Sequence, residues 1–110
     1  MLALPGHARI FVHQEAMDLR KGFEGLCFMV EEIFSQAPTD GGYFVFMNRR
    51  RDRMKVLFWD GDGFVIWYKR LEQGSFPKHK LEGTLMDRRT FLMMLEGIIP
   101  KRLQKRFQIA

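Results

Sequence analysis

The chain has 110 residues, the size of one domain, and its composition of 46% apolar and 28% charged residues excludes a disordered protein. A single cysteine, Cys27, excludes an intrachain disulfide and a cysteine zinc site. The net charge of +5 is unevenly distributed, with three basic and six acidic residues in 1–48 but fifteen basic and seven acidic residues in 49–110. This concentration of positive charge in the second half of the chain favours a polyanionic partner, first of all nucleic acid.

The sequence also limits the expected cellular location of the protein and the reactions that it could catalyse. The chain contains no apolar run of about 18 residues, which a membrane span needs, and its first residues lack the pattern of a signal peptide. We therefore expect one cytoplasmic domain covering residues 1–110. No P-loop, nucleophile elbow or zinc signature is present, so we expect no catalytic residue, metal or cofactor, and binding rather than catalysis.

The first half of the chain predicts a strand and then a helix. Residues 9–14 are rich in β-branched and aromatic side chains, which is typical of a short strand. Asp18 is a suitable N-cap, and the helix should end before Pro38, because the residue before a proline avoids helical dihedrals. Spacings of four, three, four and three predict an amphipathic helix with an apolar stripe of Leu19, Phe23, Leu26, Val30 and Ile33.

Three strands are predicted in the middle of the chain, at residues 43–47, 54–59 and 64–71. A basic turn at 48–53 joins the first two. The sequence Asp-Gly-Asp-Gly at 60–63 predicts a tight hairpin between the second and third, since glycine permits the positive φ that such a turn requires. This hairpin places Trp59 near Phe64 and Lys55 near Tyr68. A short edge piece at 75–77 and a loop at 78–84 should follow.

A second, shorter helix is predicted near the end. Asp87 is its N-cap, Met86 packs against Phe91 as a hydrophobic staple, and Gly97 ends it. Residues 101–107 are read as a last helical turn or a frayed basic end. The predicted fold class is α+β, an antiparallel β-meander of about four to five strands covered by one long and one short α-helix.

Basic residues cluster in the predicted turn and in the strands that follow it. Guanidinium groups match phosphate oxygens, and aromatic side chains beside cations on a sheet stack bases. The alternative is that the arginines form a solvated edge and that Trp59 and Trp67 belong to the core, which we favour for the aromatic residues. The predicted nucleic-acid-binding residues are Arg20, Lys21, Arg49, Arg50, Arg51, Arg53, Lys55, Lys69 and Arg70.

Acidic residues Asp60, Asp62 and Glu72 cluster in the basic half of the chain. Paired carboxylates can hold two metal ions in a nuclease. An Asp-Gly-Asp-Gly hairpin is more often turn chemistry, because aspartate bonds its own backbone there. We therefore read Asp60 and Asp62 as turn formers and predict no metal site.

Two blocks resemble a known family. Residues 18–26, DLRKGFEGL, resemble its D-M-R-K-G-F-D-G-L signature, and residues 44–57 resemble its F-V-F-x-x-R-R-x-D-R-x-K-x-L block. The family is the small second-frame protein, often called TnpB, of a group of bacterial insertion sequences with a separate DDE transposase. The resemblance implies an accessory role in transposition, with DNA, the transposase or both as partners. The alternatives are an adaptor that does not touch DNA and a metal-dependent nuclease that uses Asp60 and Asp62.

Overall fold

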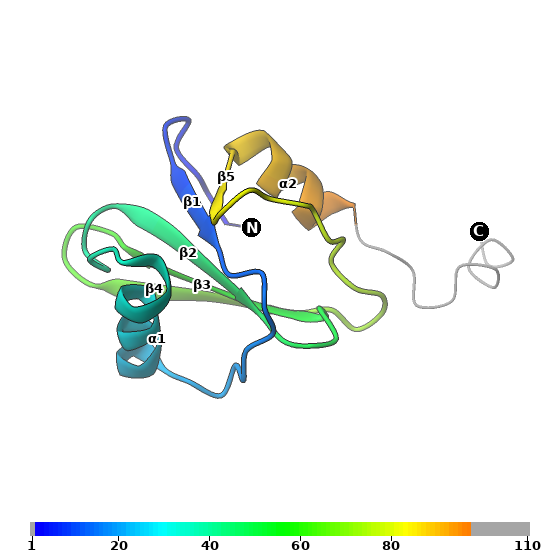
Figure 1. Cartoon of the computed structure of the whole chain (residues 1–110), viewed down its shortest axis with the longest axis horizontal. Helices are drawn as coiled ribbons and strands as arrows, with labels where there is room; N and C mark the ends of the chain where they lie inside the picture. The colour runs from blue at the N-terminus through cyan, green and yellow to red at the C-terminus, as the bar shows by residue number, and fades with distance from the viewer. Residues whose placement is uncertain (1, 98–110) are drawn as a thin grey trace, which may run out of the picture.

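The computed structural model describes residues 2–97 as a five-stranded sheet with helices packed on both of its faces (Figure 1). The strands lie in the order β4-β3-β2-β1-β5 across the sheet. In chain order the elements are β1 (Arg9–Val12), α1 (Phe23–Met29), the π-helical turn η1 (Val30–Phe34), β2 (Gly42–Met47), β3 (Arg53–Trp59), β4 (Phe64–Arg70), β5 (Leu85–Met86) and α2 (Arg88–Glu96).

The sheet is mixed, so the α+β class is confirmed but the antiparallel meander is wrong. β1 runs parallel to β2, with Phe11 opposite Phe44, whereas the other neighbouring strands are antiparallel. The physical reason lies in the connection. α1 and η1 carry the chain back to the end of the sheet where β1 began, and a return of this kind makes the next strand parallel.

The helix lengths also differ from the prediction of one long and one short helix. α1 has seven residues and continues into the five-residue turn η1, whereas α2 has nine. The predicted start at Asp18 is wrong because this carboxylate accepts hydrogen bonds from the backbone N–H and the guanidinium of Arg20, both at 3.0 Å. These bonds hold a turn before the helix, and Gly22 is still extended. Ser35, with a φ of 53°, ends η1 in the left-handed region.

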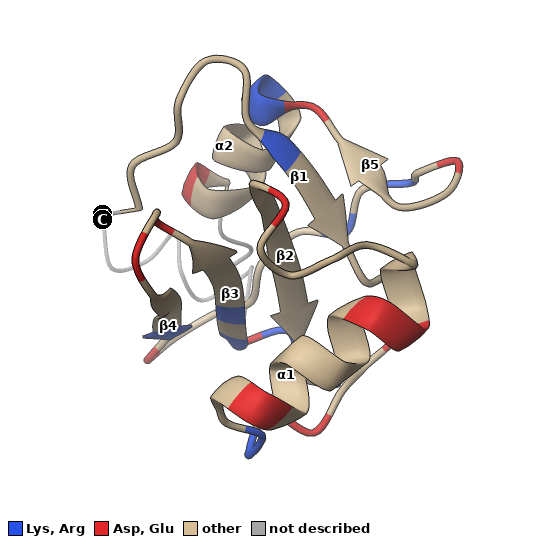
Figure 2. Ribbon diagram, turned by 90° about the vertical axis from the view of Figure 1, so that its left-hand side faces the viewer, with Lys and Arg blue, Asp and Glu red and all other residues tan. Residues whose placement is uncertain are grey.

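Alternation along β2 divides the core into two layers. Phe44 and Phe46 face α1, while Val45 and Met47 face α2, so the strand is buried on both sides, as its apolar sequence predicts. In Figure 2, β2 and β3 lie between the two helices.

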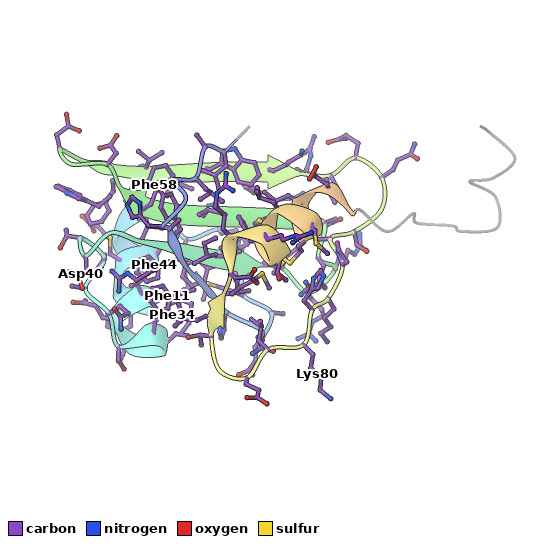
Figure 3. All side chains as sticks on the ribbon, turned by 90° about the horizontal axis from the view of Figure 1, so that it is seen from above. Phe11, Phe34, Asp40, Phe44, Phe58 and Lys80 are labelled. Carbon is purple, nitrogen blue, oxygen red and sulfur yellow. The ribbon has the colours of Figure 1, made fainter. Side chains whose placement is uncertain are left out.

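Phenylalanine rings fill the layer under η1. Figure 3 shows Phe11, Phe34 and Phe44 together, with ring centroids 5.2 Å apart for Phe11–Phe44 and 5.5 Å for Phe34–Phe44. Phe23, predicted in the apolar stripe, is the first residue of α1 and is 50% exposed. Trp67 packs half-buried against the α2 layer, and Trp59 lies edge-on to Phe64.

The predicted hairpin is confirmed. The N–H of Asp60 donates to the Gly63 carbonyl at 3.0 Å, and Gly61 has a φ of 108°. The expected pairings of Trp59 with Phe64 and of Lys55 with Tyr68 are both present.

Later in the chain the agreement is mixed. The predicted edge piece at 75–77 reduces to an isolated bridge at Ser75, and β5 was not predicted. α2 begins after Asp87 and ends at Gly97, as predicted. The predicted tail at 101–107 lies outside the described residues. Within residues 2–97, no helix is long and apolar enough to cross a membrane.

The two core layers generate a stability prediction. We expect Phe44→Ala to lower the free energy of unfolding by about 3–5 kcal/mol, because a fully buried ring is removed and a cavity remains. Phe28→Ala is the matched control, since the Phe28 side chain is 58% exposed, and its cost should stay below about 1 kcal/mol. Urea unfolding followed by circular dichroism measures both. Equal losses in the two variants would contradict the two-layer core.

Candidate nucleic-acid interface

A side-chain hydrogen-bond network builds the arginine turn between β2 and β3. Oδ1 of Asn48 accepts from the backbone N–H groups of Asp52 and Arg53 at 3.1 and 3.0 Å, and its Nδ2 donates to Asp52 at 2.6 Å. These bonds fix the turn while the Arg49 and Arg50 side chains remain exposed. Asn48 was not singled out from the sequence. Its signal was the preference of asparagine for bonding the backbone a few residues ahead of it.

Arg51 points away from its two neighbours. Its φ of 58° turns the side chain back over the protein, where Nε donates to the Phe76 carbonyl at 3.1 Å and Nη2 donates to the Pro77 carbonyl at 2.7 Å. The Arg51 carbonyl in turn accepts from the Phe76 N–H at 2.7 Å. Burial lowers the pKa of the Arg51 guanidinium. This predicted phosphate ligand is engaged in tying the 76–77 segment to the turn.

Four of the predicted nucleic-acid-binding residues line a hollow of about 560 Å³ between the segment before α1 and strands β3 and β4. β3 and β4 place Lys55, Tyr68 and Arg53 on one face of the sheet, because Lys55 is directly opposite Tyr68 and residues two apart share a face. We name this hollow the basic groove. Its lining residues are Met17, Asp18, Leu19, Arg20, Asn48, Arg50, Asp52, Arg53, Lys55 and Tyr68.

Tyr68 is the aromatic centre of the basic groove. Its side chain is 48% exposed, the Lys55 Nζ lies 4.9 Å from its ring centroid, and its hydroxyl accepts from Arg53 Nη1 at 3.3 Å. The Lys55 Nζ also donates to the Lys21 carbonyl at 2.8 Å, which joins β3 to the segment before α1. The result is an accessible ring with a cation at its face and another at its edge.

The two acidic residues of the basic groove, Asp18 and Asp52, already have side-chain partners within the protein. Asp18 pairs with the Arg20 guanidinium at 2.6 Å, and this hydrogen bond lowers the Asp18 pKa to about 2. Asp52 is held by the Asn48 amide. The groove therefore carries four cationic side chains against two acidic ones, and its electrostatic potential favours an anion.

The other predicted site residues lie around the groove or away from it. Arg70 is opposite Arg53 on the same face but pairs with Glu72 at 2.9 Å, and Lys21 contributes its backbone carbonyl. Arg49 lines a separate hollow with Lys78. Lys69 is opposite Met54 and so belongs to the α2 face.

The three clustered acids do not converge on one site, because Glu72 lies apart from Asp60 and Asp62. Asp60 and Asp62 lie in the hairpin turn, while Glu72 follows the opposite end of the seven-residue strand β4. Across residues 2–97 there is no group of three or more His, Cys, Asp or Glu side chains that could hold a metal ion.

Comparison with known proteins identifies the family. Residues 8–105 match the model of the family described as IS66 Orf2 like protein. The chain belongs to this family. The resemblance carried by residues 18–26 and 44–57 is thus confirmed, and this IS66 Orf2 like protein is an accessory protein associated with transposition.

Two relatives come from Sinorhizobium fredii. The chain is 32% identical over 100 residues to the uncharacterized protein y4jC, covering 89% of this chain and 86% of the relative. It is 35% identical over 83 residues to the uncharacterized protein y4hO, covering 76% and 72%. No solved structure matches.

Adjacent arginines in the turn should differ in their effect on stability. We expect Arg51→Ala to lower the free energy of unfolding by about 1–3 kcal/mol, because the Phe76 and Pro77 carbonyls lose a charged donor. Arg49→Ala, its matched control, removes an exposed side chain and should change stability by less than about 0.5 kcal/mol. Urea midpoints measure both. An Arg51→Ala variant as stable as Arg49→Ala would contradict this inward role.

Proposed function

We propose that this IS66 Orf2 like protein serves transposition by binding DNA of the mobile element through the basic groove. The observation that supports this most strongly is the meeting of Arg50, Arg53 and Lys55 around a half-exposed tyrosine. The fourth cation, Arg20, is paired with Asp18, and Asp52 is bonded to Asn48. Exposed Arg50 and Arg53 offer planar forks of N–H donors to phosphate oxygens. Lys55 adds a charge beside the ring.

The Tyr68 ring favours one form of DNA. An aromatic ring in a basic groove stacks an unpaired base, contributing about 1–3 kcal/mol per base, whereas bases inside a duplex are stacked on one another. We therefore propose that the groove prefers single-stranded or frayed DNA, such as the separated strands at the end of an element. Phosphate contacts from Arg50 and Arg53 would hold the strand in register without reading its sequence.

The basic residues are tested by DNA binding in a salt series. We expect Arg50→Ala/Arg53→Ala to weaken binding of a labelled oligonucleotide by about tenfold or more at low salt, because two charged donors are lost. The slope of log affinity against log salt should fall by about 0.7 for each lost contact on a single strand, or about 0.9 on a duplex. Arg89→Ala is the control, since this exposed arginine lies on α2. An unchanged affinity and slope in the double variant would sink the proposal.

The same measurement separates the role of the ring from that of charge. Tyr68→Leu should weaken single-strand binding by about fivefold to a hundredfold while leaving the salt slope unchanged, because stacking is lost but no phosphate contact is. Tyr68→Phe keeps the ring and should bind almost normally. Equal affinity of the wild-type protein for single-stranded and duplex DNA would remove the proposed preference.

A second candidate function is contact with the transposase of the element. The observation that favours it is the large apolar exposure of α1, where Phe23 is 50% and Phe28 is 58% exposed. Exposed aromatic side chains are frequent anchors of protein interfaces. We expect transposase to co-purify with the wild-type protein after nuclease treatment, and Phe28→Ala to reduce the amount recovered. Loss of co-purification on nuclease treatment would show that DNA alone joins the two proteins.

A further inference from the structure

The two edges of the sheet differ in length. β5 closes one edge with two residues, whereas the other edge is β4, with seven residues from Phe64 to Arg70. Among residues 2–97 no strand pairs with the outer side of β4, which lies at the margin of the sheet in Figure 2. A long unpaired edge presents a row of backbone donors and acceptors to another strand.

Two hydrogen bonds show which β4 residues direct their backbone N–H and C=O groups toward the free edge of the sheet. The N–H of Asp60 donates to the Gly63 carbonyl at 3.0 Å, and the N–H of Leu71 donates to the Asp52 carbonyl at 2.7 Å. Hydrogen-bonded and non-bonded pairs alternate in an antiparallel ladder, so the odd-numbered residues from 63 to 71 bond to β3. The backbone groups of Phe64, Ile66 and Tyr68 therefore point to the free edge.

The edge is apolar along most of its length and oppositely charged at its ends. Residues 64–67, Phe-Val-Ile-Trp, are all half-buried. Asp62 precedes the strand in the exposed hairpin turn, and Arg70, whose Nε donates to the exposed Glu72 carboxylate, ends it. A strand with a negative start and a positive finish is complementary to an antiparallel copy of itself, because each end then meets the opposite charge.

We propose that two copies of this chain dimerise by antiparallel pairing of their β4 edges about a two-fold axis at Ile66. In this register the Ile66 backbone groups of the two copies bond to each other, and Phe64 of each copy faces Tyr68 of the other. Asp62 of each copy lies beside Arg70 of the other. Phe64, Ile66, Tyr68 and Arg70 have outward backbone groups and share the face that carries α1, so the ladder from 64 to 68 continues without a bulge. Asp62 lies in the turn before the strand.

Charge disfavours one of the neighbouring registers. A two-fold axis at Trp67 also sets outward-facing backbone groups of the two β4 strands against each other. It would, however, place Asp62 beside Glu72 and Phe64 beside Arg70. A shift that pairs even with odd residues sets outward groups against inward ones and opposes side chains from different faces. Lys69 and Arg70 discourage pairing with unrelated strands, because charged side chains on an edge strand oppose non-specific association.

The dimer would be one continuous sheet with both α1 helices on the same side. A two-fold axis perpendicular to the sheet keeps the α1-bearing faces of the two copies on the same side of the joined sheet. Both basic grooves would then open on that same face, because Arg53, Lys55 and Tyr68 share the face that carries α1. The proposal concerns self-association and does not rest on DNA binding.

Sedimentation of the full chain without nucleic acid, over a concentration series, tests the dimer. We expect reversible dimerisation that Ile66→Pro weakens about tenfold or more, since proline removes an N–H aimed at the partner and no bond to β3. Ile66→Thr, the matched control, keeps that N–H and should still dimerise. Circular dichroism and a urea midpoint establish that Ile66→Pro is folded. A wild-type chain that stays monomeric throughout the series would overturn the proposal.

A charge exchange tests the register without altering the backbone. Asp62→Arg or Arg70→Asp alone should weaken the dimer, because each sets like charges against each other. The double variant should restore dimerisation toward the wild-type level, since the opposite charges are then exchanged. High salt should reduce all these differences. If both single variants dimerise as the wild type does, the register about Ile66 is wrong and the proposal is overturned.

Discussion

The packing of Phe11, Phe34 and Phe44 is the interaction on which the rest of the structure depends. Phe11 stacks on Phe44 across the parallel β1–β2 pair, and Phe34 covers both from the end of η1. This cluster fixes the direction in which the chain returns to the sheet and buries β2 from one side, while the α2 layer buries it from the other. β3 and β4 extend from this buried centre, and polar side chains lie at the start of β3 and at the exposed end of β4.

The arginine run shows how one turn gives adjacent identical residues different roles. Arg50 lines the basic groove, Arg49 lines another hollow, and Arg51 secures the segment that leads toward α2. The change of direction at Arg51 follows from its left-handed backbone, which the Asn48 bonds stabilise. Charge density in the sequence therefore overstates the number of cations available to a ligand.

Local signals in the sequence predicted local structure well. The three central strands, the Asp-Gly-Asp-Gly turn and the pairing of Lys55 with Tyr68 follow from alternation and turn chemistry. The helix start was missed because Arg20 captures the Asp18 carboxylate, and β5 was missed because its two residues carry no periodicity. A helix between two strands is itself a signal of parallel pairing, which the antiparallel prediction overlooked. The inward turn of Arg51 depends on a contact 25 residues away, beyond the reach of local patterns.

Gly25 shows that α1 is not built for maximal stability. A glycine inside a helix costs about 0.5–1 kcal/mol relative to alanine, mainly in backbone entropy. An alanine Cβ here would lie 3.2 Å from the Cβ of Lys21, the residue whose carbonyl holds the Lys55 ammonium. Glycine at this position lets the Lys21 side chain lie against the first turn of the helix. A gain in helix propensity at Gly25 therefore depends on whether Lys21 can give way slightly, beside the carbonyl that orients Lys55.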